Sequence, residues 1–458
     1  MARAEVDVVI VGAGTSGAYL GWRLAERGLT CLILEKNKLE DLGVVIGPFH
    51  MEEEAFERFG IPLPEGDELL HRLETITMWP PCMKGEVTAR LVTLDMDKPS
   101  FMRRLLSYAH EAGAEIREET EFTGLLREGG FPVGVRAKEP EGELEIRCRL
   151  VVDASGIGGA VRTAMPSTPW FESDPIDDMD TLVVYMESWG DLAGDFKPDI
   201  NSFLHFQGWY APSYGDEMIV GVGMPASPEG AKRRQCAFAA TLPFRGKARS
   251  STMGRVPYRR PPYSLVDNGL VVVGDAAFMN KPFSGEGVTS ALAACAIAAD
   301  VAAEALRRDD LTREALWPYN ARYFRGQGAK FAFLTALMPA LVSLSPEEID
   351  FLYSVPGVFS EEGTRALNLE YELKSDPSET LKALPALLKG AATGRLRPAS
   401  ISRMARMATA AGALRKLYES YPEHPSDFGA WVRKAAPLWE KADHARHDYF
   451  RRLLREWN

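Results

Sequence analysis

The sequence predicts an α/β protein in which a parallel sheet is interrupted by a β-rich insertion and followed by a helical region. A strand, a glycine-rich turn and a helix open the chain, and strand–helix units return near 100–117, 150–156 and 270–306. From about Thr289 onward the pattern is almost wholly helical. We therefore expect three parts: one domain from 1–75, 95–165 and 265–308, a β-rich domain from 76–94 and 166–264, and a helical region from 309–458.

The opening segment has the pattern of a dinucleotide-binding unit. Val8 to Val11 is an apolar strand that leads into Gly12, Gly14 and Gly17, spaced G-x-G-x-x-G, and then into a helix. Gly12 allows a tight turn, Gly14 leaves room for a pyrophosphate, and Gly17 lets the helix pack on the strand. Glu35 ends the second strand, where a carboxylate can accept hydrogen bonds from a ribose. Because Glu35 would repel a 2′-phosphate, we expect FAD or NAD rather than NADP.

Leu270 to Ala299 forms a second glycine-rich constellation. A buried strand ends in Gly274 and Asp275, and Ser284 to Gly287 opens an alanine-rich helix. The glycines permit close approach of a flat ring, and the helix N-terminus can stabilise negative charge on that ring. The run Asp153-Ala154-Ser155-Gly156 follows another buried strand. Together with the N-terminal pattern, these motifs indicate a flavin nucleotide.

From Asp7 to about Leu306, and more loosely in the helical tail, the chain resembles the geranylgeranyl reductase family. That family belongs to a larger class of FAD enzymes that includes aromatic hydroxylases. The resemblance implies a Rossmann-like FAD-binding domain of the aromatic hydroxylase type, interrupted by a β-rich substrate domain. It implies that FAD is held by Gly12, Ala13, Gly14, Ser16, Gly17, Glu35, Lys36, Lys98, Gly274, Asp275, Gly285, Gly287 and Val288. Lys98 stands where relatives often carry an arginine, so the charge is kept without the bidentate fork.

The chain also departs from the family pattern. Relatives often carry a Cys-Gly pair in the loop after the second strand, whereas this loop reads Gly43-Val44-Val45-Ile46-Gly47. Cys82 is the nearest loop cysteine. The aromatic substrate-sheet signature is reduced to Gly208-Trp209-Tyr210-Ala211-Pro212. Our candidates are Tyr210 and Glu286 for catalysis and Trp209 and Phe283 for the substrate pocket, with the apolar segment Phe331 to Leu344 as a pocket wall or a core helix pair.

The resemblance implies an FAD-dependent oxidoreductase that reduces carbon–carbon double bonds of an isoprenoid lipid. The alternatives are an FAD-dependent monooxygenase and an electron-transfer flavoprotein that reduces a quinone; a flavin halogenase would need a Trp-x-Trp-x-Ile-Pro signature, which is absent. No second G-x-G-x-x-G follows a strand. The electron donor is therefore expected to be a transiently bound NAD(P)H, a ferredoxin-like protein or a quinol.

Composition limits the remaining classes. The net charge of −11 argues against nucleic-acid binding, and the five scattered cysteines offer no metal site and fit a reducing compartment. The first strand begins close to Met1, so we expect no signal peptide and a cytoplasmic protein. Gly287 to Leu306 is expected to be a buried helix rather than a membrane span. Trp431 to Asn458 interleaves apolar and basic residues, so it could dock on its own domain or rest on a membrane surface.

Overall fold

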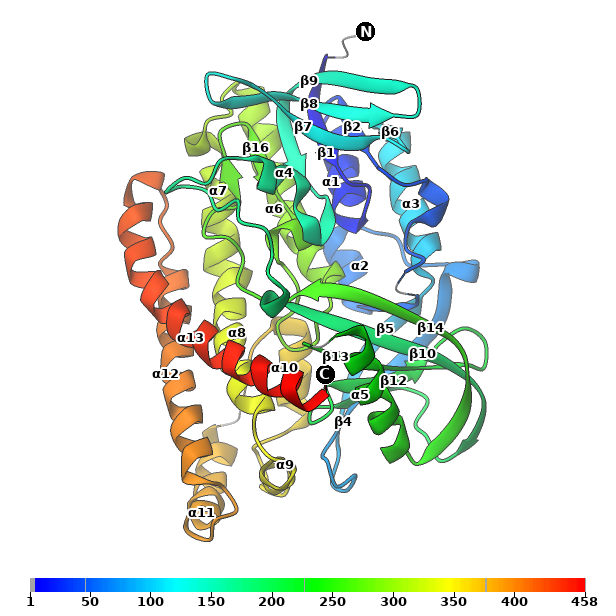
Figure 1. Ribbon diagram of the computed structural model, residues 1–458, viewed down its shortest axis with the longest axis vertical. Coiled ribbons are helices and arrows are strands. Elements are labelled where there is room, and N and C mark those ends of the chain that lie inside the picture. Colours follow the sequence, from blue (N-terminus) through cyan, green and yellow to red (C-terminus); the bar gives the residue numbers. More distant parts are fainter. Residues whose placement is uncertain (1–4, 46, 226, 375–376, 458) are drawn as a thin grey trace.

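The computed structural model describes residues 5–45, 47–225, 227–374 and 377–457, and it contains two eight-stranded sheets (Figure 1). Ile46 and Asn458, which belong to segments considered above, lie outside the described residues. The first sheet occupies the upper part of Figure 1 and the second the lower right. α12 (Pro398–Glu419) lies along the left side, and α13 (Phe428–Trp457) crosses from the upper left to the C-terminus near the centre. The expected mixed α/β architecture with a helical C-terminal region is confirmed.

The first sheet has a parallel centre, in the order β16-β9-β1-β2-β6. All four residues of β2 are buried, as expected for a parallel strand covered on both faces. β15 pairs antiparallel at one edge, and the β7–β8 hairpin extends β9. The strands are β1 (Glu5–Val11), β2 (Cys31–Leu34), β6 (Glu115–Arg117), β7 (Glu121–Glu128), β8 (Phe131–Glu139), β9 (Gly142–Asp153), β15 (Val266–Asp267) and β16 (Leu270–Val272).

The second sheet is antiparallel except where β11 runs parallel to β4, and its order is β14-β10-β13-β12-β11-β4-β5-β3. α5 (Pro228–Thr241) packs on one face. Because β3 and most of β4 precede residue 76, this sheet begins earlier in the chain than the predicted domain boundary. The strands are β3 (Phe49–Glu52), β4 (Leu69–Trp79), β5 (Val87–Met96), β10 (Thr181–Gly194), β11 (Ile200–Phe203), β12 (Gly208–Pro212), β13 (Met218–Met224) and β14 (Phe244–Pro257).

The helices of the first domain cluster on its parallel sheet. α1 (Thr15–Ala25) packs against both α3 (Lys98–Glu111) and α6 (Val288–Arg307). α6 is long and apolar enough to cross a membrane, but 67% of its apolar window is buried inside the protein, which fits the expected core helix. Two shorter helices complete this part of the chain, α2 (Glu53–Phe59) and α4 (Ala160–Ala164).

The C-terminal region is helical, as expected. The segment Arg313–Val342 and the following α9 also pass the length and apolarity test for a membrane span, but they are bent by 113°. In α13, Trp431, Trp439 and Phe450 are buried against the rest of the protein, so this helix docks on its own chain. The helices are α7 (Arg313–Tyr323), α8 (Ala329–Val342), α9 (Pro346–Tyr353), α10 (Glu361–Glu370), α11 (Pro377–Ala392), α12 (Pro398–Glu419) and α13 (Phe428–Trp457).

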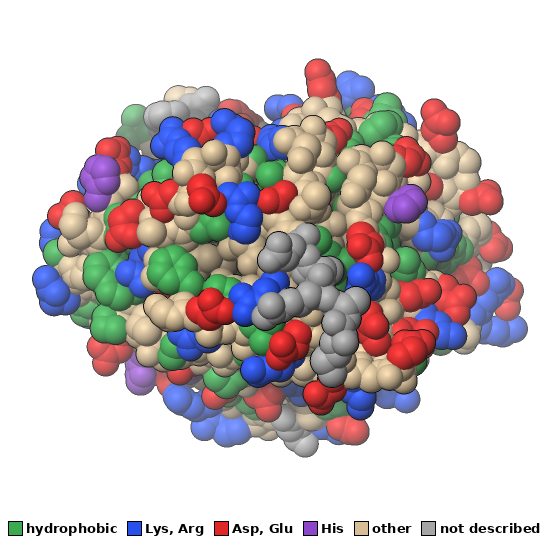
Figure 2. Space-filling model, turned by 90° about the horizontal axis from the view of Figure 1, so that it is seen from above, with side chains coloured by type: hydrophobic (Ala, Val, Ile, Leu, Met, Phe, Trp, Pro, Cys, Tyr) green, Lys and Arg blue, Asp and Glu red, His purple; other side chains and the backbone are tan. Residues whose placement is uncertain are grey.

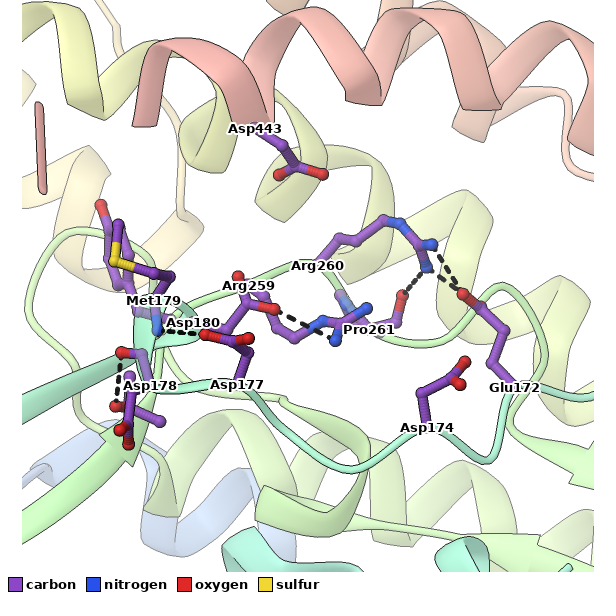
Figure 3. A network of polar contacts seen from close by, with 12 residues as sticks. Glu172, Asp174, Asp177, Asp178, Met179, Asp180, Arg259, Arg260, Pro261 and Asp443 are labelled. Atoms are coloured by element: carbon purple, nitrogen blue, oxygen red, sulfur yellow. Dashed lines mark hydrogen bonds and ion pairs between the residues drawn. The ribbon is translucent and has the colours of Figure 1, made fainter. Parts of the chain in front are cut away.

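Ion pairs join the segments that cross between the two sheets (Figure 3). Arg260 donates to both oxygens of Glu172, at 3.0 and 2.7 Å. The carboxylate of Asp180 forms one ion pair with Arg259, at 3.1 Å, and another with Arg446 of α13. Burial raises the pKa of Glu172, but the neighbouring Arg260 outweighs this and holds that pKa below its usual range. The pairs therefore fix both crossover segments and the last helix to one another.

Figure 2 shows the molecule from above. Acidic and basic side chains are interspersed over this face.

We predict that Arg260→Ala lowers the free energy of unfolding by about 3 kcal/mol, because it leaves the carboxylate of Glu172 in a partly buried site without its partner. The matched control is Arg255→Ala, which removes an exposed ion pair with Asp178 and should cost less than about 1 kcal/mol. Urea unfolding at neutral pH measures both values. Equal losses in the two variants would contradict a stabilising role for the Arg260–Glu172 pair.

Candidate active site

The first turn of α1 is crowded on two sides and open on the third. A Cβ atom on Gly12, whose φ is +103°, would lie 2.4 Å from the carbonyl oxygen of Ala154. A Cβ atom on Gly17 would lie 1.9 Å from the carbonyl oxygen of Gly12. At Gly14, the N-cap of α1, a Cβ atom would have no neighbour within 4 Å. The open space at Gly14 thus lies directly at a helix N-terminus, where phosphate groups bind favourably.

Glu35 is buried beside this turn, with 6% of its surface exposed. One carboxylate oxygen accepts the backbone N–H of Ala13 at 3.1 Å, and the other accepts the N–H of Asn37 at 2.9 Å. These bonds fix the carboxylate next to the glycine turn, as binding of a ribose hydroxyl requires. The side chain of Lys36 is exposed.

The Gly-Asp turn after β16 packs against the same end of α1. A Cβ atom on Gly274, whose φ is +64°, would lie 2.3 Å from Oγ of Ser16. A Cβ atom on Gly287 would lie 3.2 Å from Oδ1 of Asp275, so this carboxyl group lies beside the start of α6. Burial raises the pKa of Asp275, and the charge of Lys98 partly opposes this. The turns that contain Gly12 and Gly274 and the start of α6 at Gly287 thus lie together around the N-terminus of α1.

Lys98 and the loop after the second strand lie together. A Cβ atom on Gly43, with φ +83°, would lie 2.9 Å from the backbone nitrogen of Pro99 and 3.2 Å from Cγ of Lys98. Burial lowers the pKa of Lys98, while the carboxylate of Asp275 acts in the opposite direction. The same loop reaches the second sheet, because the hydroxyl of Thr252 donates to the carbonyl of Val45. A cofactor that contacts this loop would therefore lie between the two sheets.

A buried ion-pair network at the start of α6 was missed by sequence reasoning. Lys281 is 2% exposed, and its ammonium group lies 2.5 Å from Glu52 and 3.1 Å from Glu286. Thr289 donates to the other oxygen of Glu52 at 2.9 Å. Burial acts against the charge of Lys281, but Glu286 and Glu52 raise its pKa. Glu52 lies on β3, so this network ties the second sheet to the loop of Ser284 to Val288.

Burial likewise acts against the charge of Glu286, yet Lys281 and then His50 lower the pKa of this carboxyl group. The side chain of Glu286 is 42% exposed, which leaves it accessible at the rim of the loop. Ser284 donates to it at 3.1 Å. Glu286 is therefore ionised and held in place. In the sequence, the only indication of its ion-pair partner Lys281 is that a lysine stands close to a glycine-rich loop.

Tyr210, the other catalytic candidate, does not lie with these residues. It is 1% exposed and packs in the core beneath α5, together with Phe203 and Phe238. Its neighbour Trp209 points to the opposite face of the sheet, where it contacts Met186 and Ile219. The ring of Tyr210 lies among apolar side chains, and its hydroxyl accepts the backbone N–H of Lys197 at 3.5 Å. This position does not suit a proton donor, and we replace that hypothesis below.

Phe283 packs beside Phe331 at the first turns of α8, in a cluster that also contains Phe333 and Tyr371. α8 begins next to α6, since Gln327 donates to the carbonyl of Ser290 at 3.1 Å. An apolar helix thus starts at the loop that carries Glu286. Cys82 lies instead in the exposed turn between β4 and β5, where its N–H binds Asp350. It therefore does not replace the loop cysteine of the family.

We predict that Gly14→Val gives a folded protein that retains no flavin, because the valine side chain would occupy the open space at the helix N-terminus. Gly17→Val should instead lower the free energy of unfolding by about 1–3 kcal/mol, because its side chain would collide with the backbone of Gly12. Absorbance near 450 nm and thermal unfolding measure the two effects. A yellow Gly14→Val protein would contradict phosphate binding at this turn.

The comparisons with known proteins agree with this geometry. The FAD dependent oxidoreductase family matches residues 43–301, and an NAD(P)-binding Rossmann-like domain matches residues 10–57. A digeranylgeranylglycerophospholipid reductase of Sulfolobus acidocaldarius is 26% identical over 95% of this chain and 97% of its own length. A reductase of the same name from Methanococcoides burtonii is 28% identical over 76% of this chain and 86% of its own.

Two solved structures share the fold. A geranylgeranyl bacteriochlorophyll reductase-like protein of Thermoplasma acidophilum superposes with a TM-score of 0.72 at 18% identity, covering 89% of this chain and all of that one. The flavin-dependent brominase Bmp2 gives 0.62 at 16% identity, covering 84% and 99%. The family match covers more than half of the chain. The open turn at Gly14, the buried carboxyl group of Glu35 and the half-buried carboxyl group of Asp275 suit the two ends of FAD. The protein therefore belongs to the FAD-dependent oxidoreductase family, and its cofactor is FAD.

Proposed function

We propose that this enzyme reduces carbon–carbon double bonds in the isoprenoid chains of a lipid. The observation that carries the proposal is the similarity to a digeranylgeranylglycerophospholipid reductase along nearly the whole of both chains. Bound FAD, once reduced, supplies hydride to one carbon of the double bond. The similarity to the brominase is one of fold alone, at 16% identity. It therefore gives no support to an oxygen-consuming reaction, and the monooxygenase and quinone-reducing alternatives have weaker support than the reductase.

The residues around the proposed site suit such a substrate. An isolated alkene has no polar handle, so its binding must come from burial of apolar surface, at roughly 0.8 kcal/mol for each methylene. Phe283 and Phe331 offer such surface beside the loop that carries Glu286. Trp209 stays a proposed pocket residue, and it packs with Met186 and Ile219 in the second sheet. Gly12, Gly14 and Gly17 would hold the pyrophosphate, Glu35 the adenosine ribose, and Asp275 the ribityl chain. Lys98 would add positive charge near the cofactor.

The electron donor comes from outside the chain in this proposal. The NAD(P)-binding match covers residues 10–57, which is the segment that we assign to FAD. NAD(P)H bound transiently or a ferredoxin-like protein could each reduce the flavin, and we retain both. We further propose a cytoplasmic protein that contacts a membrane peripherally, since its substrate would be a lipid.

α11 is the element that best suits membrane contact. Its leucines at positions 381, 384 and 388 are 72%, 49% and 62% exposed and lie three and four residues apart on one helix face. Lys389 follows them on the same helix, and basic side chains near an apolar face favour anionic lipid surfaces. The apolar residues of α13 are buried or half-buried against the rest of the protein, so α11 replaces the terminal segment as the proposed contact.

Anaerobic single turnover tests the proposed reaction. We expect the photoreduced enzyme to regain its oxidised flavin spectrum when geranylgeranyl lipid is added, with the lipid gaining two hydrogens per flavin. A saturated lipid of equal length serves as the control and should leave the flavin reduced. If the lipid stayed unchanged while oxygen gave a hydroxylated product, the monooxygenase alternative would replace the reductase.

Membrane contact is tested by co-sedimentation with anionic lipid vesicles. We predict that the double variant Leu381→Glu, Leu388→Glu binds at least about tenfold more weakly, because two exposed leucines no longer enter the lipid. Leu63→Glu is the matched control, since Leu63 is 54% exposed but lies outside α11. Vesicle binding that is unchanged in the double variant, or equally weakened in the control, would contradict contact through α11.

A further inference from the structure

Three titratable side chains form a row across neighbouring strands of the second sheet. His50 on β3 lies directly opposite Asp95 on β5, and Asp95 lies opposite His71 on β4. Residues directly opposite one another in antiparallel strands project from the same face. The other face carries Met51, which pairs with Leu94 and belongs to the main apolar core. The three polar side chains therefore share one face at the end of the sheet.

Asp95 is the unusual member of this row. Its side chain has no exposed surface, and neither carboxyl oxygen has a side-chain hydrogen-bond partner among the described residues. The backbone N–H of Met96 is the polar group that favours its charged form. Nε2 of His50 lies 3.5 Å from Oδ1 of Asp95. The hydroxyl of Thr93, two residues before Asp95, has no hydrogen-bond partner within the part of the chain that the structure describes. A buried polar group without a partner costs roughly 1–3 kcal/mol, so its presence calls for a functional reason.

Burial also sets where the proton resides. It raises the pKa of Asp95 to about 8. Burial lowers the pKa of His50, although the carboxylates of Glu286 and Glu52 oppose that effect. Near neutral pH the favoured state is therefore a protonated Asp95 beside a neutral His50. The pair holds one proton below about pH 8 and releases it above that pH.

The row faces the start of α6. Glu52 is two residues after His50, so the two side chains leave β3 in the same direction, and Glu52 binds Lys281 and Thr289. His50 is 14% exposed whereas Asp95 is fully enclosed, so His50 is the member that reaches accessible space. The other groups facing the row are Glu52, Lys281 and Glu286, with His71 held by the carbonyl of Ser213 and Tyr214 donating to Asp97.

We propose that His50, backed by Asp95, donates the proton that completes reduction of the double bond. This inference rests on the proposed function. One alkene carbon receives hydride from reduced FAD, which returns to its oxidised form, and the other carbon receives the proton from Nδ1 of His50. The π bond is replaced by two C–H bonds. Nε2 of His50 takes the carboxyl proton of Asp95, and water restores that proton afterwards. His50 is the catalytic residue and Asp95 the positioning and reservoir residue.

The first test does not depend on turnover. Infrared titration of the oxidised FAD-loaded enzyme should show the C=O stretch of a protonated carboxylic acid that disappears with a midpoint near pH 8 and is absent in Asp95→Asn. If the wild-type signal vanished below pH 6, or persisted in Asp95→Asn, the assignment would be overturned. A lipid that fails to react with the wild-type enzyme would refute the proposed function, but it would leave this titration intact.

The second test uses anaerobic single turnover. We expect His50→Gln and Asp95→Asn to slow alkene reduction at least about 100-fold, the scale of a lost general acid, while flavin content and photoreduction stay normal. The wild-type rate should fall above about pH 8, because the donor proton is then lost, and Asp95→Asn should lack that fall. His110→Gln, an exposed histidine of α3, is the control and should behave as wild type. A His50→Gln rate within twofold of wild type would overturn the proposal.

Discussion

The close contact at the start of α1 is the constraint on which the rest of the site depends. Gly12 and Gly17 meet at a distance that excludes any side chain, and Gly12 also touches the loop of Ala154. Because α1 sits so near β1, the turn at Gly274 can rest on Ser16. Segments separated by more than 250 residues thus converge at one helix end. The cofactor space is what remains once these backbones have packed together.

The parts of the site that could be predicted are those formed by residues close together in the sequence. Gly12, Gly14, Gly17 and Glu35 act within about 25 residues, so their spacing alone indicates their arrangement. Pairing between distant strands carries no such signal. β3 has only four residues, and nothing in Phe49 to Glu52 states that it pairs with β5 in the second sheet. The two-residue period of a strand also leaves open which face is covered, so Trp209 and Tyr210 could not be told apart.

The same reasoning explains why His50 and Asp95 were missed. They are 45 positions apart, and the histidines are scattered along the sequence without a ligand spacing. Only the register of β3 with β5 and of β5 with β4 brings them into contact. A polar residue within an apolar strand is a weak indication by itself, because most such residues face solvent. The complete burial of Asp95 results from the packing of the folded protein around β5, and it cannot be deduced from the sequence of β5 alone.

The two halves of the proposed site have different origins, and this makes domain packing part of the chemistry. The apolar surface of α8 begins beside α6, whereas His50 and Asp95 belong to the second sheet. Lys281 joins them by binding Glu52 across the boundary. The ion pairs of Arg260 and Asp180 hold the crossover segments and α13 in register with both sheets. A shift between the domains would therefore separate the proton from the double bond while leaving each domain folded, so these distant ion pairs constrain the reaction geometry as well as stability.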